Sequence, residues 1–277
     1  MKIKAPAKLN LSLNVFPKKR TEGLYPVKFL NYQLILADEI KIQPSDEITV
    51  SSLPEVEGEN NLVYRAIPLL PQKKGIKINI KKNIPVKAGL AGGSADAAAV
   101  LNYLNKAWRL NLSSVQLAAI GQKLGMDVVY CLTGGLCLIE GTGEKVRPLN
   151  LSLPQLPILV INPAEQKPSS GWAYQNLDLA KIGRHEEKLT ALIQAIKKKN
   201  IRQIAANIHN DFEYSVPKAY PAVKQIKKEL LRVGALSAML CGSGLAVFGI
   251  YENKKLALMA YNKLKKKFPQ IFLTETK

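Results

Sequence analysis

The sequence predicts a protein of mixed strands and helices that divides into two domains. Its 277 residues, 47% of them hydrophobic, supply enough apolar material for one large core or two ordinary ones. Segments in which apolar and polar residues alternate occur beside segments with helical spacing, so both kinds of element are expected. A proline-rich stretch, Pro148 to Pro163, interrupts the chain, and there we divide it into domains at residues 1–152 and 153–277.

The N-terminal part begins with strands. From Ala7 to Val15 the apolar residues fall on one face and the polar residues on the other, which is the period of a strand. A polar loop follows at residues 17–22, and Asn61 to Leu70 reads as a short helix. The same reasoning predicts further strands at residues 27–35, 39–42, 47–50 and 75–81.

A glycine-rich loop then leads into two helices. The first is expected at residues 94–108, with Ser94 as its N-cap and Asp96 in its first turn. The second is expected at residues 115–124 and ends at Gly125. The order of strand, glycine-rich loop and helix is therefore predicted for the middle of this domain.

The C-terminal part reads as helices and strands that start with a strand at residues 157–162. Val233 to Tyr251 carries no charged side chain, but four glycines interrupt it, so we predict buried strands around a turn at 241–244 rather than a membrane span. The remaining elements are helices at residues 172–179, 185–199, 201–206, 219–233 and 254–267 and a strand at residues 271–275.

The glycine-rich loop has the features of a phosphate-binding site. It opens a helix, so unpaired backbone N–H groups and the positive end of the helix dipole point to one place. Lys81, Lys82 and Lys87 add mobile positive charge nearby. The loop lacks the Gly-Lys-Ser/Thr ending of a Walker loop and the dinucleotide-binding fingerprint. The alternative is an ordinary glycine-containing turn.

Asp127 and Lys8 are candidate partners. Asp127 follows a helix stop and precedes the apolar run VVYCL, so we expect it to be drawn toward the interior, where it needs a cation or hydrogen bonds. Lys8 stands on the polar face of an otherwise apolar strand, and Asn10 projects the same way. The alternative is that Asp127 caps the following helix and Lys8 faces water.

Composition argues against several other classes of protein. The 40 Lys+Arg exceed the 21 Asp+Glu to give a net charge of +19, which would attract nucleic acid or phosphorylated small molecules. Lysine runs such as Lys197 to Lys199 are nevertheless typical of solvated helix faces. The three cysteines form no ligand cluster, the two histidines are separated in sequence, and the lysine-rich start lacks a signal peptide. We therefore expect a cytoplasmic chain without a disulfide framework, a protein-held metal site or a membrane segment.

Four segments together resemble a known family. Ala5 to Val15, Pro85 to Ala99, Leu124 to Gly135 and Met239 to Tyr251 are similar, in order and spacing, to the motifs of the galactokinase, homoserine kinase, mevalonate kinase and phosphomevalonate kinase (GHMP) superfamily. The resemblance implies a two-domain α+β fold, with an N-terminal half like domain 2 of ribosomal protein S5, a ferredoxin-like α/β C-terminal half and an active site in the cleft between them.

The resemblance also implies roles for particular residues. Asp127 would take the proton from the substrate hydroxyl, and Lys8 would orient that hydroxyl and offset developing charge. Asn61 would lie near the adenine of ATP, and Mg²⁺ would bridge phosphate oxygens. The residues that would contact the acceptor substrate are Asn10, Tyr25, Ser170, Gly242 and Ser243. The residues that would wrap the ATP phosphates are Pro85, Val86, Lys87, Ala88, Gly89, Leu90, Ala91, Gly92, Gly93, Ser94 and Ala95.

Within the superfamily, residues 7–10, 59–63 and 210–213 resemble the members that phosphorylate the 2-hydroxyl of 4-diphosphocytidyl-2-C-methyl-D-erythritol in the non-mevalonate isoprenoid pathway. The chain departs from them at residues 22–25, where Tyr25 stands in place of a histidine that would bond the cytosine. Tyr25 could still stack on a base or donate its hydroxyl. The loop also has Lys87 and Ala91 where glycines are usual. The alternatives are a kinase of homoserine or a mevalonate derivative, and a basic nucleic-acid-binding protein.

Overall fold

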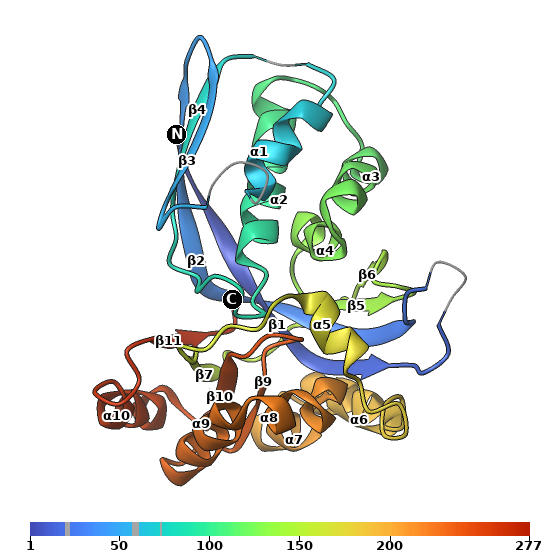
Figure 1. The fold of residues 1–277 in the computed structure, drawn as a ribbon, viewed down its shortest axis with the longest axis vertical. Coiled ribbons are helices and arrows are strands. Elements are labelled where there is room, and N and C mark those ends of the chain that lie inside the picture. Colours follow the sequence, from blue (N-terminus) through green and yellow to red (C-terminus); the bar gives the residue numbers. More distant parts are fainter. Residues whose placement is uncertain (20–22, 57–60, 73) are drawn as a thin grey trace. The chain divides into compact units, whose positions relative to one another are not determined.

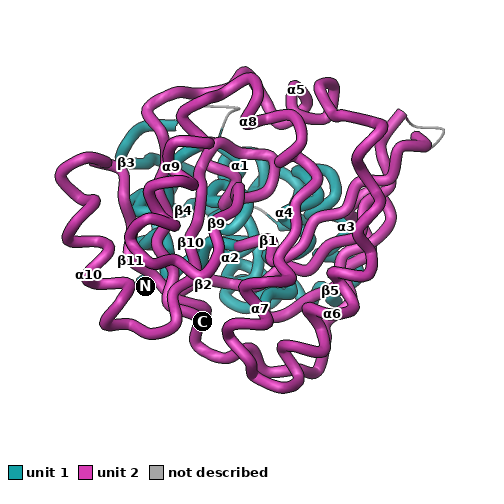
Figure 2. The backbone as a smooth tube through the Cα atoms, turned by 90° about the horizontal axis from the view of Figure 1, so that it is seen from below, with its two compact units in different colours: residues 1–8, 36–86, 91–134 teal, residues 9–35, 87–90, 135–277 magenta. Residues whose placement is uncertain are grey.

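The computed structural model of the chain describes residues 1–19, 23–56, 61–72 and 74–277. Within them the chain forms two compact units (Figure 2). Unit 1 consists of residues 1–8, 36–86 and 91–134, and unit 2 of residues 9–35, 87–90 and 135–277. Each unit is therefore assembled from separate stretches of sequence, and the division at residues 152 and 153 stays a prediction. The end of the predicted polar loop, residues 20–22, lies outside the described residues.

Among the described residues, seven strands form one sheet that contains the N-terminal strands. Its central order is β3-β4-β2-β1-β8, and β5 joins β2 to β6. β2 pairs antiparallel with β4 and β5, whereas β3 pairs parallel with β4 and β1 pairs parallel with β8. These strands are β1 (Lys2–Val15), β2 (Val27–Pro44), β3 (Ile48–Leu53), β4 (Ile76–Lys81), β5 (Cys137–Glu140), β6 (Lys145–Pro148) and β8 (His209–Asn210).

Three features of this sheet differ from the prediction. The two strands expected at 27–35 and 39–42 are one continuous strand, β2. The hairpin of β5 and β6 was not predicted, because each strand has only four residues. The polar face of β1 is also buried, because its side chains bond neighbouring strand segments: Ser12 Oγ accepts a hydrogen bond from the backbone N–H of Leu30.

The helices of unit 1 pack against one another as well as on the sheet (Figure 1). α2 contacts α1, α3 and α4, and their buried faces share one apolar core with β2 and β4. The predicted stop at Gly125 is confirmed, and Ser113 forms a capping box with Gln116 at the start of α3. The helices are α1 (Leu62–Ala66), the 3-10 helix η2 (Ile67–Leu69), α2 (Gly92–Ala107), α3 (Ser114–Leu124) and α4 (Met126–Thr133).

Unit 2 contains an antiparallel four-stranded sheet in the order β11-β7-β10-β9. α9 packs on β9 and β10, and α10 packs on β7 and β11, which encloses a second apolar core. The strands are β7 (Pro157–Ile161), β9 (Ser237–Leu240), β10 (Val247–Ile250) and β11 (Ile271–Glu275). The helices are α5 (Ser170–Gln175), α6 (Glu186–Lys197), α7 (Ile201–Asn207), η3 (Asp211–Tyr214), α8 (Val216–Ala219), α9 (Pro221–Arg232) and α10 (Lys254–Leu264).

Most elements of unit 2 lie where they were predicted, but β8, η3 and α8 were not predicted. α5 begins at Ser170, two residues early, because Ser169 accepts a hydrogen bond from the backbone N–H of Trp172 and caps the helix there. The helix expected at 219–233 is α9, which begins at Pro221, whereas Ala219 ends the preceding helix α8. None of the described helices combines the length and the apolar character needed to cross a bilayer.

Candidate active site

Lys8 and Asp127 meet in unit 1. Lys8 lies on β1, Asp127 lies in the first turn of α4, and the Lys8 Nζ is 3.7 Å from the Asp127 Oδ1. The Lys8 side chain is only 6% exposed, whereas that of Asp127 is 43% exposed. The alternative that Lys8 faces water is therefore wrong, and so is the expectation that Asp127 is drawn inside. The first turn of α4 leaves Asp127 at the surface, while Val128, Val129 and Tyr130 fill the core.

The glycine-rich loop runs from Pro85 to Ala91, and α2 begins at Gly92. Ala91 precedes the helix with a left-handed backbone, φ 56° and ψ 34°. Ser94 is therefore not the N-cap, and Asp96 lies beyond the first turn, because Gly92 and Gly93 already have helical geometry. Lys87 is also left-handed, at φ 58°. This explains why glycine is usual at both positions, since a side chain there costs about 1–2 kcal/mol.

The loop touches the turn between β9 and β10 within unit 2. A Cβ atom added to Gly89, at φ 88°, would lie 1.9 Å from the carbonyl oxygen of Cys241. A Cβ atom on Gly244 would lie 2.3 Å from the carbonyl oxygen of Ala88. Neither position has room for a side chain, so glycine is required for the two backbones to approach this closely.

The turn itself is held by a residue whose role the sequence reasoning missed. Asn210 is buried, and its Nδ2 donates hydrogen bonds to the carbonyl oxygens of Gly242, at 2.8 Å, and Leu240, at 3.2 Å. Its Oδ1 accepts from the backbone N–H of Phe212. Gly242 is in the left-handed region, at φ 54°, and Ser243 beside it is half-buried. The only signal for this role in the sequence was the asparagine at the start of the motif at 210–213.

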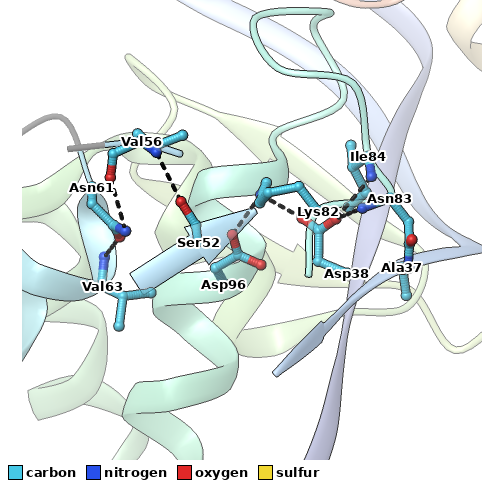
Figure 3. Close-up of polar contacts among 10 residues, drawn as sticks. All are labelled: Ala37, Asp38, Ser52, Val56, Asn61, Val63, Lys82, Asn83, Ile84 and Asp96. Carbon is cyan, nitrogen blue, oxygen red and sulfur yellow. Dashed lines mark hydrogen bonds and ion pairs between the residues drawn. The ribbon is translucent and has the colours of Figure 1, made fainter. Parts of the chain in front are cut away.

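Asn61 caps α1. Its Oδ1 accepts a hydrogen bond from the backbone N–H of Val63 at 3.0 Å, and its Nδ2 donates to the carbonyl oxygen of Val56 at 3.4 Å (Figure 3). The side chain is buried. Its amide thus fixes the start of the helix, and contact with an adenine stays a prediction.

The predicted acceptor residues occupy different surroundings within unit 2. Asn10 is buried and its Nδ2 donates to the Oδ1 of Asn31 at 2.7 Å. The ring of Tyr25 stacks on that of Tyr174, with centroids 6.3 Å apart and planes 14° apart, and the Lys19 ammonium lies 5.0 Å from its centroid. Ser170 is exposed at the first residue of α5. Tyr25 therefore belongs to an aromatic surface that also carries positive charge.

Lys82 is not the mobile cation that the sequence suggested. Its ammonium is ion-paired with both Asp38 and Asp96, and its side chain is 5% exposed (Figure 3). Burial lowers the pKa of this ammonium, but the two carboxylates more than offset the effect and raise it above its ordinary value. Lys81, in contrast, is exposed on β4. The two neighbouring lysines lie on opposite sides of the chain, as successive residues of an extended segment do.

The two histidines, which are separate in sequence, are brought together. The rings of His185 and His209 have centroids 4.7 Å apart. The Nε2 of His209 is 2.8 Å from the Oδ1 of Asp211, and the Tyr214 hydroxyl is 2.8 Å from the Nε2 of His185. Asp211 also accepts hydrogen bonds from the backbone N–H groups of Val15 and Gly183. The cluster therefore ties the end of β1 to the start of η3.

The chain matches two family models. The model described as the GHMP kinases N terminal domain matches residues 61–135, and the model described as GHMP kinases C terminal matches residues 192–270. The first covers α1 to α4 with the glycine-rich loop and Asp127. The second covers the turn at 241–244 with its flanking strands.

Curated relatives match over the full length of the chain. A 4-diphosphocytidyl-2-C-methyl-D-erythritol kinase from Caldicellulosiruptor bescii is 43% identical over 100% of this chain and 98% of that relative. One of the same name from Acetivibrio thermocellus is 41% identical over 99% of this chain and 98% of that relative.

Solved structures support the same fold. A crystal structure of 4-(cytidine 5'-diphospho)-2C-methyl-D-erythritol kinase is similar with a TM-score of 0.83 and 28% identity, covering 100% of this chain and 99% of that one. The mevalonate kinase of Methanococcus jannaschii has a TM-score of 0.75 at 18% identity, over 100% of this chain and 98% of that one, and shares the fold. The predicted two-domain α+β architecture is thereby confirmed. This chain belongs to the GHMP kinases and, within them, to the family of the 4-diphosphocytidyl-2-C-methyl-D-erythritol kinases.

Proposed function

We propose that this chain transfers the γ-phosphoryl group of ATP to the 2-hydroxyl of 4-diphosphocytidyl-2-C-methyl-D-erythritol, a reaction of the non-mevalonate isoprenoid pathway. As a GHMP kinase it is an ATP-dependent small-molecule kinase. The choice of acceptor rests on the names of relatives about 40% identical over the full length. The structural observation that carries the proposal is the approach of Lys8 to Asp127.

In this proposal Asp127 is the general base and Lys8 its charged partner. Asp127 is half-exposed, so its carboxylate is accessible to a substrate hydroxyl. The buried ammonium of Lys8 holds a positive charge close to that carboxylate. Because phosphoryl transfer depends mainly on positioning and charge neutralisation, these two groups fit the deprotonation and orientation of an attacking alcohol.

The residues Pro85 to Ala95 are proposed to bind the ATP phosphates through their backbone. Gly92 and Gly93 begin α2, whose first N–H groups lack partners inside the helix. The contact of Gly89 with Cys241 supports a shared surface formed by the loop and the turn at Gly242 and Ser243. We also propose that the adenine of ATP lies near Asn61.

Mg²⁺ is the proposed metal cofactor. The described residues include no group of three or more His, Cys, Asp or Glu side chains that could hold a metal ion. The described side chains therefore fit Mg²⁺ only if the ion takes most of its ligands from ATP phosphates and water, which is common for this ion. When bound, it would neutralise charge on the phosphate oxygens.

The acceptor is proposed to contact Asn10, Tyr25, Ser170, Gly242 and Ser243. The aromatic surface of Tyr25 and Tyr174 suits stacking of a cytosine ring, and Lys19 beside it suits a diphosphate. The tyrosine hydroxyl takes the place of the histidine that is absent here. None of the three cysteines, all of which are described, forms a disulfide bond, and this supports the proposed location in the cytoplasm.

An acceptor panel tests the function. The purified chain is given ATP and Mg²⁺ with 4-diphosphocytidyl-2-C-methyl-D-erythritol, homoserine or mevalonate, and ADP release is measured. We expect ADP only with the cytidyl substrate, with ³¹P NMR locating the new phosphate on the 2-hydroxyl. Asp127→Asn is the control for contaminating kinases.

Two results would contradict the proposal. Turnover with homoserine or mevalonate but not with the cytidyl compound would assign the chain to another GHMP activity. Tight, salt-dependent binding of RNA, combined with no effect of ATP on the melting temperature, would favour a nucleic-acid-binding protein.

A further inference from the structure

A buried cluster of three charged side chains connects the two ends of the glycine-rich loop. Lys82 directly follows β4, Asp38 lies within β2, and Asp96 lies on α2. The Lys82 Nζ donates to the Oδ2 of Asp96 at 2.5 Å and to the Oδ2 of Asp38 (Figure 3). All three side chains are at most 5% exposed. Charged groups are seldom buried this completely unless they are paired.

Asp38 holds the chain where it enters the loop. Its Oδ1 accepts hydrogen bonds from the backbone N–H groups of Asn83, at 2.5 Å, and Ile84, at 2.8 Å. The Asn83 side chain donates to the carbonyl oxygen of Ala37 at 2.9 Å. The two residues before Pro85 are therefore fixed to β2 through both backbone and side-chain bonds.

Asp96 holds the chain where it leaves the loop. It lies in the second turn of α2, and the same ammonium that reaches Asp38 reaches its carboxylate. A Cβ atom added to Gly92 would lie 3.3 Å from the Lys82 Nζ and 3.1 Å from the Ile84 side chain. The first residue of α2 is thus packed directly against the cluster.

We propose that Lys82, Asp38 and Asp96 form a positioning cluster that fixes both ends of the glycine-rich loop in the conformation that binds the ATP phosphates. The inference rests on the proposed function of that loop. Lys82 acts as a positioning residue, because its ammonium is engaged by two carboxylates. Without Lys82, the loop would lose the link between its entry and its exit.

One carboxyl group of the cluster, that of Asp96, is expected to titrate near neutral pH. Lys82 is one cation between two carboxylates, and Asp38 receives three hydrogen bonds whereas Asp96 receives one. Among the described atoms, the Oδ1 of Asp96 has no hydrogen-bond partner. Burial, together with the charge of Asp38 and against that of Lys82, raises the pKa of Asp96 to about 7. The unpaired Oδ1 and this raised pKa both favour a protonated Asp96 carboxyl group at and below neutral pH.

Among the described residues, the charged groups that act on Asp96 are Lys82 and Asp38. The thiol of Cys131 on α4 is affected by the charge of Asp96 in turn. Burial raises the pKa of that thiol, so it stays neutral. Ionisation of Asp96 changes the net charge of the cluster from zero to −1, which opposes phosphate binding at the start of α2. ATP affinity is thus expected to fall as pH rises through neutrality.

The test compares ATP binding by wild-type, Lys82→Met, Asp96→Asn and Lys77→Met proteins, measured calorimetrically from pH 6 to 8.5. Lys77 is an exposed lysine on β4 and supplies the matched control. We expect the dissociation constant of ATP to rise about tenfold or more in Lys82→Met and less than about twofold in Lys77→Met. The KM for the acceptor should remain unchanged.

Asp96→Asn keeps the shape of the side chain and removes its titration, so it should fold and bind ATP at pH 6 as the wild type does. Above neutrality it should bind about two- to fivefold more tightly than the wild type. Equal pH profiles for the two proteins, or wild-type affinity in Lys82→Met, would overturn the inference. If the wild type itself binds no ATP, the proposed function fails and this inference fails with it.

Discussion

Lys8 and Lys82 are both buried lysines of unit 1, but they are held in different ways. Lys82 lies between two buried carboxylates, whereas Lys8 lies 3.7 Å from the carboxylate of Asp127, which is half-exposed. The ammonium of Lys82 is bonded on both sides and is suited to fixing backbone segments. The ammonium of Lys8 faces an accessible carboxylate and is suited to chemistry on a ligand. The roles proposed for the two lysines therefore go with a difference in the exposure of the acid partner, because the lysines themselves are equally buried.

The largest effect is expected from Asp127→Asn. Loss of a general base should lower kcat about 10³-fold while the ATP dissociation constant changes less than about twofold. Asp96→Asn is the matched change at the other lysine, and its kcat at pH 6 should stay close to that of the wild type. Single-turnover ADP formation measures both. A kcat for Asp127→Asn within tenfold of the wild type would remove the proposed distinction between the two acids.

Replacing each lysine by methionine should affect stability unequally. Lys82→Met leaves two buried carboxylates without a cation and should lower the free energy of unfolding by about 3–5 kcal/mol. Lys8→Met leaves Asp127 accessible to water and should cost about 1 kcal/mol or less. Urea denaturation of both variants gives the two values. The double variant Lys82→Met with Asp96→Asn should recover part of the loss above neutral pH, because it removes the charge that Asp96 carries there.

The pH dependence of stability should distinguish the surroundings of Asp96 from those of Asp127. The pKa of Asp96 is raised from its ordinary value of 3.8 to about 7 in the fold, so the folded state keeps a proton that the unfolded chain releases. The proton kept by Asp96 contributes its full stabilisation below about pH 4. As pH rises from there to about 7, the free energy of unfolding falls by up to about 1.4 kcal/mol per pH unit.

Asp96→Asn should therefore gain stability relative to the wild type between pH 5 and pH 8, as followed by melting temperature. Asp127→Asn removes a carboxylate that is 43% exposed and is the matched comparison in this measurement. A constant difference between Asp96→Asn and the wild type across this range would contradict the assignment of the proton.

The smallest effect is expected from Ala91→Gly. The left-handed backbone at residue 91 favours glycine, but glycine also makes the unfolded chain more flexible, so the two effects largely cancel. The free energy of unfolding should change by less than about 1 kcal/mol. If the Lys82 cluster sets the loop conformation, ATP affinity should also stay within about twofold. A large loss of affinity would mean that residue 91 itself sets the loop conformation.

The approach of Lys8 to Asp127 could be predicted because both residues break their local pattern. Lys8 is the charged residue on the polar face of its predicted strand, and Asp127 separates a helix stop from an apolar run. The position of Lys82 could not be predicted, because Lys81 and Lys82 look alike until the end of β4 is known. A signal was nevertheless present: Asp96 is surrounded by alanines on its helix, which indicates a buried carboxylate in need of a cation.

Most elements were predictable from periodicity, and the exceptions have physical causes. β5 and β6 are too short to show an alternating pattern, although Gly141 to Gly143 marks the turn between them. The start of α2 was misplaced because glycines disfavour helices locally, and here the packing of Gly92 against Ile84 and Lys82 overrides that preference. The burial of the polar face of β1 depends on distant segments that no local pattern reveals.

The parallel pairing of β1 with β8 also bears on how the protein is made. Ser12 and Leu13 are synthesised long before their pairing partners His209 and Asn210. The neighbouring strand β2 waits longer still, since Leu34 bridges to Thr276 and Gln33 accepts a hydrogen bond from the backbone of Lys277. Until those later segments have been made, these strand edges lack their native partners and are open to wrong ones.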